Sequence, residues 1–543
     1  MSTNLRSVRA LLPAASDYRG LRRSWRSDVL AGVTVGIVAL PLALAFGVSS
    51  GAGAESGLVT AIIAGTVAAV FGGSNVQVSG PTGAMVVVLA PILALHGAGA
   101  LAVICLLAGV LVVVAGALRL GRTVGYIPWP VIEGFTLGIA VIIFLQQIPT
   151  ATGTPVGEST NAAVAAWQSL VQATWPKAGW SLLLVAVVVA VMLVSLRLHP
   201  RFPGSLLAIV VASLIGLALP VDTIGELPAG LPTPTLPAFD PGMLLSLAGP
   251  AVAVAALAAI ESLLSARVAS TLADTGSYDP DRELVGQGLA SIAAGLFGGM
   301  PATGAIARTA VNVRAGARTR VASITHALLL LVIALVGASV VSHIPLAALA
   351  GVLVVTACRM IAPSTVRTVL RSTRADAVVF CLTAVITVSV DLIYAVLIGV
   401  LAAGFFALRQ LARTSGVQRE ELPGAAHPGD ERIAVFRLEG ALFFGAAEKM
   451  LERVSELRDV EVVIIRMSQL QVLDATGAQV ITALITSLER RGITVLVKGI
   501  APQHRALAER VGVLASLRHQ NHLFDELGPA VAHARSHTAR GGA

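Results

Sequence analysis

Long apolar stretches separated by short polar ones dominate the first three quarters of the chain. Residues 29–54 and 56–118 contain no formal charge, and residues 321–358 contain only His326 and His343 as readily titratable groups. A helix needs about 20 apolar residues to cross a bilayer, so the pattern predicts a many-pass helical membrane protein. We predict fourteen apolar segments: 28–50, 55–72, 81–95, 98–118, 127–148, 178–197, 204–220, 243–270, 283–299, 303–313, 320–341, 344–361, 376–391 and 393–411.

Two of these segments, 81–95 and 303–313, are too short to span a membrane alone. They hold corresponding places in two halves of seven segments. Phe-Gly-Gly at 71–73 precedes Thr-Gly-Ala at 82–84, and the same pair of motifs recurs at 297–299 and 303–305. An odd number of segments in each half predicts two repeats that run in opposite senses. Paired short, Gly/Pro-interrupted segments are the sequence feature that best indicates a transporter's binding site.

The composition changes after residue 413. We expect a cytoplasmic segment at 1–27, a transport domain at 28–413, a linker at 414–430, a soluble α/β domain at 431–531 and a disordered tail at 532–543. The α/β assignment depends on two short β-branched runs, 460–465 and 493–497, which are typical of buried strands. Between them lie apolar residues at helical spacing, which predict a helix with one apolar face: Ala478, Ile481, Leu484, Ile485 and Leu488.

Composition and charge support the membrane class. The 543 residues are 55% hydrophobic and 13% charged, whereas soluble domains carry about 25% charged residues. The net charge of +8 is compatible with nucleic-acid binding. However, the arginines cluster before the first segment and in alternate connections, as the positive-inside rule requires for a cytoplasmic N-terminus. The three cysteines lack disulfide or metal spacing, and we expect no cofactor, no metal and no enzyme activity.

Glu261 is the one formal charge within residues 241–266. A carboxylate at the centre of a membrane helix costs about 2.5–3.5 kcal/mol on insertion scales, so a functional role is the default hypothesis. An ionised acid beside an anion site repels the substrate, and a proton or a bound cation removes that repulsion. We therefore assign Glu261 to coupling, with Ser265, one helical turn on, as the residue that orients it.

The two short segments predict an anion site. Residues 76–79 are expected to be extended, with Pro81 in the first turn of the next helix. If the repeats are inverted, two helix N-termini point toward one another, and their free N–H groups and positive dipole ends attract an anion. The candidate residues from this argument include Thr303 and Arg308, the latter adding a full positive charge. Asp281, Arg282 and Glu283 are expected in a solvated loop and helix start.

These motifs together resemble the SulP family of sulfate permeases and related anion transporters. The resemblance covers nearly the whole chain and is carried by residues 28–36 with Pro41, by Glu-Ser-Leu-Leu-Ser-Ala at 261–266, by 283–288 and by 301–312. It implies a seven-plus-seven inverted repeat with core and gate domains, a cytoplasmic STAS domain, elevator-like motion and a homodimer. It also implies a substrate site at the two short segments, lined by Phe46, Gln77, Ser79, Gly83, Ala84, Gly304, Ala305 and Ala307.

The same resemblance bears on regulation and coupling. Residues 474–477 resemble the STAS loop that carries a phosphorylatable hydroxyl in bacterial anti-sigma antagonists, which makes Thr476 a candidate regulatory residue. A helix cap made by Asp474 or Thr476 is the structural alternative. The sodium-coupled bicarbonate branch tends to place Asp at the position of Glu261 and a hydroxyl at that of Ile306, so this chain's residues favour a proton.

We therefore expect a multi-pass protein of the inner (plasma) membrane, with both termini cytoplasmic, that takes up sulfate or a related small anion with protons. Sodium-coupled bicarbonate uptake, C4-dicarboxylate symport and anion exchange or channel activity remain alternatives. A membrane anchor whose STAS domain binds a partner protein is the alternative from another class.

Overall fold

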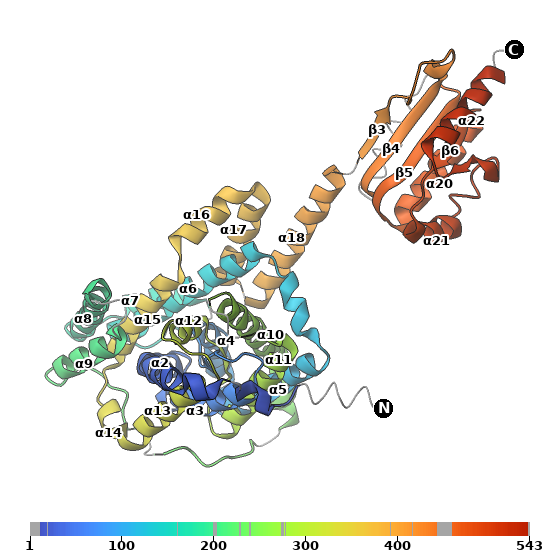
Figure 1. The fold of residues 1–543 in the computed structure, drawn as a ribbon. Coiled ribbons are helices and arrows are strands. Elements are labelled where there is room, and N and C mark those ends of the chain that lie inside the picture. The colour runs from blue at the N-terminus through green and yellow to red at the C-terminus, as the bar shows by residue number, and fades with distance from the viewer. Residues whose placement is uncertain are drawn as a thin grey trace. The chain divides into compact units, whose positions relative to one another are not determined.

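The computed structural model describes residues 11–18, 20–159, 161–198, 203–226, 230–237, 240–272, 276, 278–390, 392–414, 416–442 and 459–540. The chain divides into two compact units, Met1–Val400 and Leu401–Ala543. Figure 1 shows a helical unit and a smaller unit built around a sheet. Each is described by itself.

The first unit is helical, and each of the fourteen predicted apolar segments overlaps one of its helices. Eight helical stretches of the described residues are long and apolar enough to cross a membrane. The helices are α2 (Leu21–Ser49), α3 (Ala54–Phe71), α4 (Gly83–His96), α5 (Ala100–Ala117), α6 (Trp129–Thr152), α7 (Ala162–Val171), α8 (Lys177–Leu198), α9 (Gly204–Gly216), α10 (Pro241–Leu272), α11 (Pro280–Leu296), α12 (Ile306–Arg314), α13 (Val321–Val336), α14 (Ala338–Val341), α15 (Leu346–Met360), α16 (Pro363–Ser372), α17 (Arg374–Ser389) and α18 (Leu392–Thr414), which crosses the unit boundary.

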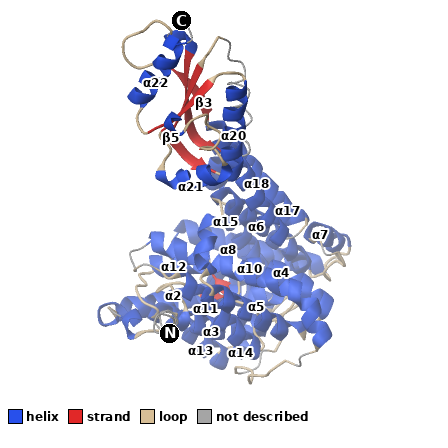
Figure 2. Ribbon diagram, turned by 90° about the vertical axis from the view of Figure 1, so that its right-hand side faces the viewer, coloured by secondary structure: helices blue, strands red, loops and turns tan. Residues whose placement is uncertain are grey.

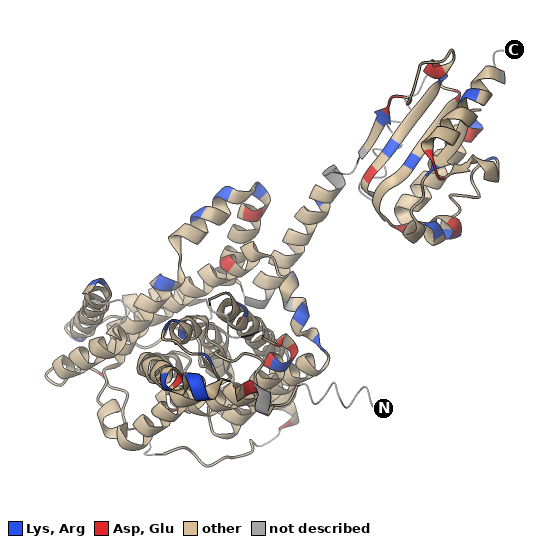
Figure 3. Ribbon diagram, viewed as in Figure 1, with Lys and Arg blue, Asp and Glu red and all other residues tan. Residues whose placement is uncertain are grey.

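The helices of this unit pack mainly within two groups. In the first group α5 packs on α11 and α10, α3 on α11, and α13 on α2 and α3. In the second group α6 packs on α15 and α17, and α8 on α9 and α15. Contacts of α2 with α15 and of α4 with α6 join the groups. Figure 3 shows few charged residues along these helices, and α16 carries Arg367 and Arg371.

Glycines allow close helix crossings within the first group. A Cβ added at Gly109 on α5 would lie 2.7 Å from the Gly288 carbonyl oxygen on α11, and one at Gly288 would lie 2.5 Å from the Gly109 carbonyl oxygen. Neither position admits a side chain without backbone movement. Small residues at such crossings let two helix backbones approach, which is a main source of packing energy in membranes.

The two short helices, α4 and α12, each follow a two-residue strand. β1 (Ser79–Gly80) and β2 (Thr303–Gly304) pair antiparallel, with Ser79 opposite Gly304 and Gly80 opposite Thr303. Figure 2 shows this strand pair among the helices. Residue 79 is extended as expected, but Pro81 lies before α4 rather than in its first turn.

Buried charges hold the glycine turn that follows α3. Gly73 and Ser74 donate their backbone N–H groups to Glu283 Oε2 at 2.8 and 3.0 Å. Arg320 Nη1 donates to the Gly72 carbonyl oxygen at 2.7 Å. A cation at a helix C-terminus satisfies carbonyls that have no partner within the helix.

Residues 281–283 begin a helix as expected, but the expectation that they lie in a solvated loop is wrong. Asp281, Arg282 and Glu283 are 4%, 7% and 1% exposed. Asp279 caps α11, and Arg282 Nη2 forms an ion pair with Asp17 Oδ2 at 2.6 Å. Local sequence shows a run of charges but not their distant partners, such as Asp17, Gly73 and Gly121.

The second unit is a five-stranded sheet with helices on both faces. The strand order is β3 (Gly416–Glu420), β4 (Ile433–Leu442), β5 (Val462–Leu473), β6 (Thr494–Lys498) and β7 (Leu523–Phe524), and only β3 is antiparallel to its neighbour. Side chains of α20 (Ala475–Arg490) and α21 (Pro502–Val511) share one apolar core with the sheet. Those of α22 (Leu527–Arg540) share a second. All five residues predicted for the apolar face of α20 are buried.

Two expected boundaries of this unit need correction. Residues 416–420, expected in the linker, form β3, whose sequence has too few apolar positions to predict a strand. Glu420 instead pairs with Arg437 and Arg466 on the neighbouring strands. Residues 532–540, expected to be disordered, lie in α22, which buries Ala530, Val531 and Ala534 against the sheet. Alanine gives a weak apolar signal, and the expectation failed for that reason.

Candidate functional site

The N-termini of α4 and α12 meet at the β1–β2 pair. Ala305 donates its N–H to the Val78 carbonyl oxygen at 2.8 Å, which continues the pairing beyond the strands. Neither helix has a side-chain cap. No acceptor is found among the described residues for the first-turn N–H groups, which belong to residues 83–85 and 306–308. Free N–H groups at two converging helix starts are the arrangement that attracts an anion.

Glu261 on α10 lies at this junction. Its Oε2 atom accepts hydrogen bonds from Thr82 Oγ1 at 2.8 Å and from Thr303 Oγ1 at 2.6 Å. The two hydroxyl oxygens are 3.0 Å apart. One threonine comes from each half of the chain, so a single carboxylate oxygen bridges both helix starts. This contact brings the predicted coupling acid to the predicted anion site.

Ser265 does not orient Glu261 as expected. Its Oγ atom lies 3.0 Å from Thr309 Oγ1, and Thr309 Oγ1 also accepts the Val78 N–H at 3.0 Å. Ser262, beside the acid in sequence, accepts the Gly304 N–H at 3.0 Å. These serines fix α10 to the strand pair, whereas the threonines contact the acid.

Arg308 is buried beside β1, with 2% of its surface exposed. Its Nη2 atom donates to the Pro81 carbonyl oxygen at 2.5 Å, and its Nη1 atom has no hydrogen-bond partner among the described residues. A Cβ added at Gly80 would lie 2.9 Å from Nη1. Arg308 therefore neither reaches the protein surface nor forms an ion pair with Glu261 within 4.0 Å. Its Nη1 atom, beside the strand pair, is a cationic N–H group without a hydrogen-bond partner in the described part of the chain.

The Gln77 side chain lies against β2. It is 5% exposed, and neither of its amide atoms has a partner among the described residues. A Cβ added at Gly304 would lie 1.8 Å from Gln77 Nε2. The amide therefore fills the space that a side chain at 304 would need. A buried amide with open donors and acceptors is available to a polar ligand.

The remaining predicted residues surround the same junction. A Cβ added at Gly83 would lie 3.4 Å from the Phe46 ring, so α2 contributes this ring beside the start of α4. Ser79 Oγ accepts from Gln287 Nε2 at 2.5 Å. Ala84 and Ala305 are buried, whereas Ala307 and its neighbour Ile306 are exposed. The first turn of α12 is the open side of the site.

Several buried polar residues near the site were not predicted, among them Ser262, Gln287, Thr309, Asn312 and His326. Gln287 joins Ser79 to Glu283 Oε1, which lies 3.0 Å from Gln287 Nε2. Both ring nitrogens of His326 lack partners among the described residues. A polar residue within an apolar segment was the available signal for His326. Gln287, Thr309 and Asn312 lie within residues 283–288 and 301–312, which we used only as motifs that resemble the family.

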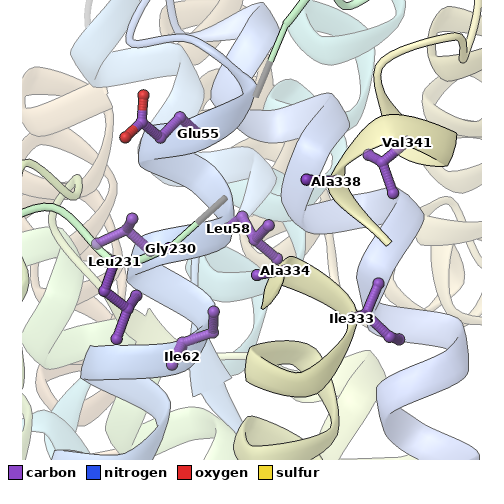
Figure 4. A pocket seen from close by; sticks show the side chains of 10 residues that line it. Glu55, Leu58, Ile62, Gly230, Leu231, Ile333, Ala334, Ala338 and Val341 are labelled. Atoms are coloured by element: carbon purple, nitrogen blue, oxygen red, sulfur yellow. The ribbon is translucent and has the colours of Figure 1, made fainter. Parts of the chain in front are cut away.

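A separate cavity, lined by α3, α13, α14 and residues 230–231, lies apart from this site. Figure 4 shows Glu55 among side chains that are otherwise apolar, such as Leu58, Ile62 and Ile333. The cavity volume of about 20 Å³ admits about one water molecule. It is too small and too apolar to be the anion site.

Thr476, the predicted regulatory residue, is exposed in the first turn of α20. The helix cap is Asp474, whose Oδ1 atom accepts the Gly477 N–H at 2.7 Å. The hydroxyl of Thr476 is therefore not used as the cap.

Comparison with known proteins identifies the family. Residues 25–383 match the sulfate permease family, and residues 425–530 match the STAS domain. The chain belongs to the sulfate permease family. It is a multi-pass membrane protein of a family of transporters, not enzymes.

Two relatives extend over most of the chain. The "Putative sulfate transporter YvdB" of Bacillus subtilis (strain 168) is 34% identical over 515 residues, which cover 93% of this chain and 96% of that protein. The bicarbonate transporter BicA of Picosynechococcus sp. (strain ATCC 27264 / PCC 7002 / PR-6) is 30% identical over 521 residues, which cover 90% and 91%. The structure of SLC26A9 matches with a TM-score of 0.83 at 17% identity, over 99% of this chain and 94% of that one, and supports the fold alone.

Proposed function

We propose that this sulfate permease family member is a secondary active transporter that takes up sulfate or a related small anion together with protons. The observation that carries the proposal is the bridge from Glu261 Oε2 to Thr82 and Thr303 at the two helix starts. It brings a titratable acid within hydrogen-bond distance of both halves of the anion site.

The electrostatics of the site support coupling. The uncapped N–H groups of α4 and α12 and the cationic Nη1 of Arg308 favour a negative ligand. An ionised Glu261 in the same place opposes it, because like charges close together in a low-dielectric site repel strongly. Protonation of Glu261 removes the repulsion, so anion and proton bind together and leave together.

Sodium-coupled bicarbonate uptake is the second candidate. The 30% identity with bicarbonate transporter BicA favours bicarbonate. Three oxygen atoms, from Glu261, Thr82 and Thr303, converge within 3.0 Å of one another, and oxygen ligands suit hard cations. A sodium ion at these oxygens would neutralise the acid as a proton does.

The topology is part of the proposal. We infer fourteen membrane segments in two inverted halves, an inner-membrane location with both termini in the cytoplasm, and a homodimer. The pairing of β1 with β2 supports related roles for the third and tenth segments. The arginine clusters of alternate connections support the orientation. Thr476 is proposed as a site where phosphorylation or a partner protein regulates transport.

Uptake by purified full-length protein in liposomes tests the proposal. Radiolabelled sulfate, bicarbonate and fumarate are each offered with an imposed proton gradient or sodium gradient. The proposal expects sulfate to accumulate when the outside is acidic, without sodium, and to stop accumulating when a protonophore is added. Sodium-driven bicarbonate uptake that ignores pH would favour the second candidate. Absence of uptake for all three anions would contradict both and favour a membrane-anchored STAS protein.

A further inference from the structure

Three histidines gather at one place in the STAS domain. His522 ends the short helix η4 (Gln520–His522), directly before β7, and His533 and His537 lie one turn apart on α22. The rings of His533 and His537 are 5.0 Å apart between centroids, and the His522 ring is 5.5 and 5.8 Å from them. Histidines four residues apart on a helix present their rings on the same face.

The spacing of the ring nitrogens fits a metal ion. One nitrogen from each of the three histidines lies within 4.8 Å of the others. The Nε2 atoms of His533 and His537 are 3.3 Å apart. Two nitrogens bound tetrahedrally to zinc at about 2.0–2.1 Å are separated by about 3.3–3.4 Å. The pair on α22 therefore already has the separation that tetrahedral coordination requires.

His522 is the buried member of the cluster. It is 2% exposed, and its Nδ1 atom has no hydrogen-bond partner among the described residues. An imidazole binds a metal ion through a ring nitrogen that carries no proton.

A buried nitrogen without a partner is costly, and three imidazoles in contact gain little from one another. A bound cation would give the buried Nδ1 atom of His522 a partner. Imidazole ligands suit zinc, copper and nickel, whereas magnesium and calcium prefer oxygen ligands.

We propose that His522, His533 and His537 form a binding site for a divalent transition-metal ion of the zinc class. Three histidines leave a fourth tetrahedral position open, which water fills. The half-buried rings of His533 and His537 form the entrance. The ion joins the segment before β7 to α22, so metal binding stabilises the docking of α22 on the sheet.

Equilibrium binding of zinc to the full-length, chelator-stripped protein in detergent tests the site. The wild type and the variants His533→Ala, His537→Gln and His519→Ala are compared by competition with a zinc-responsive dye. His519 is the matched control, since its exposed ring contacts His522 at 5.4 Å but is not part of the metal-binding group. Loss of outer-shell support alone weakens metal binding by about 10–100-fold. Loss of a ligand should therefore weaken the tight site by at least about 100-fold.

The expected result is one tight zinc per chain in the wild type and in His519→Ala, with that site lost in the other two variants. Zinc should also raise the unfolding temperature of the wild type and not that of His537→Gln. The wild-type His537 side chain is half-buried near the end of α22. Equal zinc affinity in the wild type and in both ligand variants would overturn the proposal. A loss that is as large in His519→Ala as in His533→Ala would overturn the assigned ligands.

Discussion

Gly304 provides a direct steric test of the site. A Cβ added there would lie 1.8 Å from Gln77 Nε2, 2.7 Å from Gln77 Cδ and 3.1 Å from Ser262 Cα. In Gly304→Ala the Gln77 amide must move by about 1.6 Å to reach ordinary contact at 3.4 Å. The amide and β2 are both buried, so the movement displaces groups that line the proposed anion site.

The expected free-energy cost of Gly304→Ala follows from the overlap between the added methyl group and the Gln77 amide. Overpacking a tightly packed site by one methyl group costs about 1–3 kcal/mol. If that cost falls on the substrate-bound state, the apparent affinity for the transported anion decreases by about 5- to 140-fold. Removal of the clashing Gln77 amide should relieve most of this overpacking cost. In a Gln77→Ala background, Gly304→Ala should therefore cost at least about 1 kcal/mol less than in the wild type.

The assay is concentration-dependent anion uptake into liposomes by the four proteins of this double-mutant cycle. Gly249→Ala is the control, because a Cβ at that position of α10 meets nothing within 4 Å, and it should transport like the wild type. Thermal unfolding of each variant separates a site effect from a folding effect. Wild-type affinity in Gly304→Ala, or strictly additive losses in the double variant, would refute the assigned contact between Gln77 and β2.

Three further predictions concern other parts of the chain. Thr303→Val removes a hydroxyl donor to Glu261, a hydrogen bond worth about 1.5–3 kcal/mol when one partner is charged. Proton-driven uptake should fall at least tenfold, and unchanged uptake would show that the bond has no role in transport. Asp17→Asn breaks the ion pair with Arg282 and should destabilise the protein by about 3 kcal/mol in thermal unfolding. Burial opposes ionisation of Asp17, but its bonds to Arg282 and to backbone outweigh that effect and keep its pKa below 3.8. The pair's contribution should therefore be present above this pH and be lost as the pH falls below the lowered pKa. Asp474→Ala removes the cap of α20 and should lower the stability of the STAS domain by about 1 kcal/mol in denaturant unfolding; no change would show that the cap is dispensable.

Apolar segments were the most predictable part of the fold. Each of the fourteen expected segments overlaps a helix, because a run of apolar residues in a membrane leaves the backbone no alternative to helical hydrogen bonds. The helices α7 and α16 were not predicted. In α16, polar and charged residues such as Arg367 and Arg371 interrupt the apolar positions. The strand β3 was missed because its pairing with β4 sets its conformation more than its own five residues do.

The site was predictable as a set of residues but not as a set of contacts. Glu261 and the two Thr-Gly-Ala motifs stand out in sequence, and they meet in the fold. The partner of Glu261 was wrongly expected to be Ser265. Helical spacing places Ser265 on the same face as the acid, but it cannot reveal that Thr82 and Thr303, far away in sequence, lie closer.

The histidines of α22 were not recognised from the sequence for a different reason. His533 and His537 have the spacing of a helical metal-binding pair, but the tail that contains them was expected to be disordered. The three cysteines lack metal-binding spacing, so we expected no metal. Recognition of the cluster required α22 to be helical and His522 to lie beside it, and both depend on the folded sheet.

The most direct test of the central claim compares Glu261→Gln with the wild type in liposomes. Glutamine keeps the size of the side chain and its hydrogen bonding to Thr82 and Thr303, but it cannot release a proton. The account predicts that the variant still exchanges internal for external sulfate and no longer accumulates sulfate when the outside is acidic. Accumulation by Glu261→Gln to the wild-type level under the same proton gradient would contradict the account.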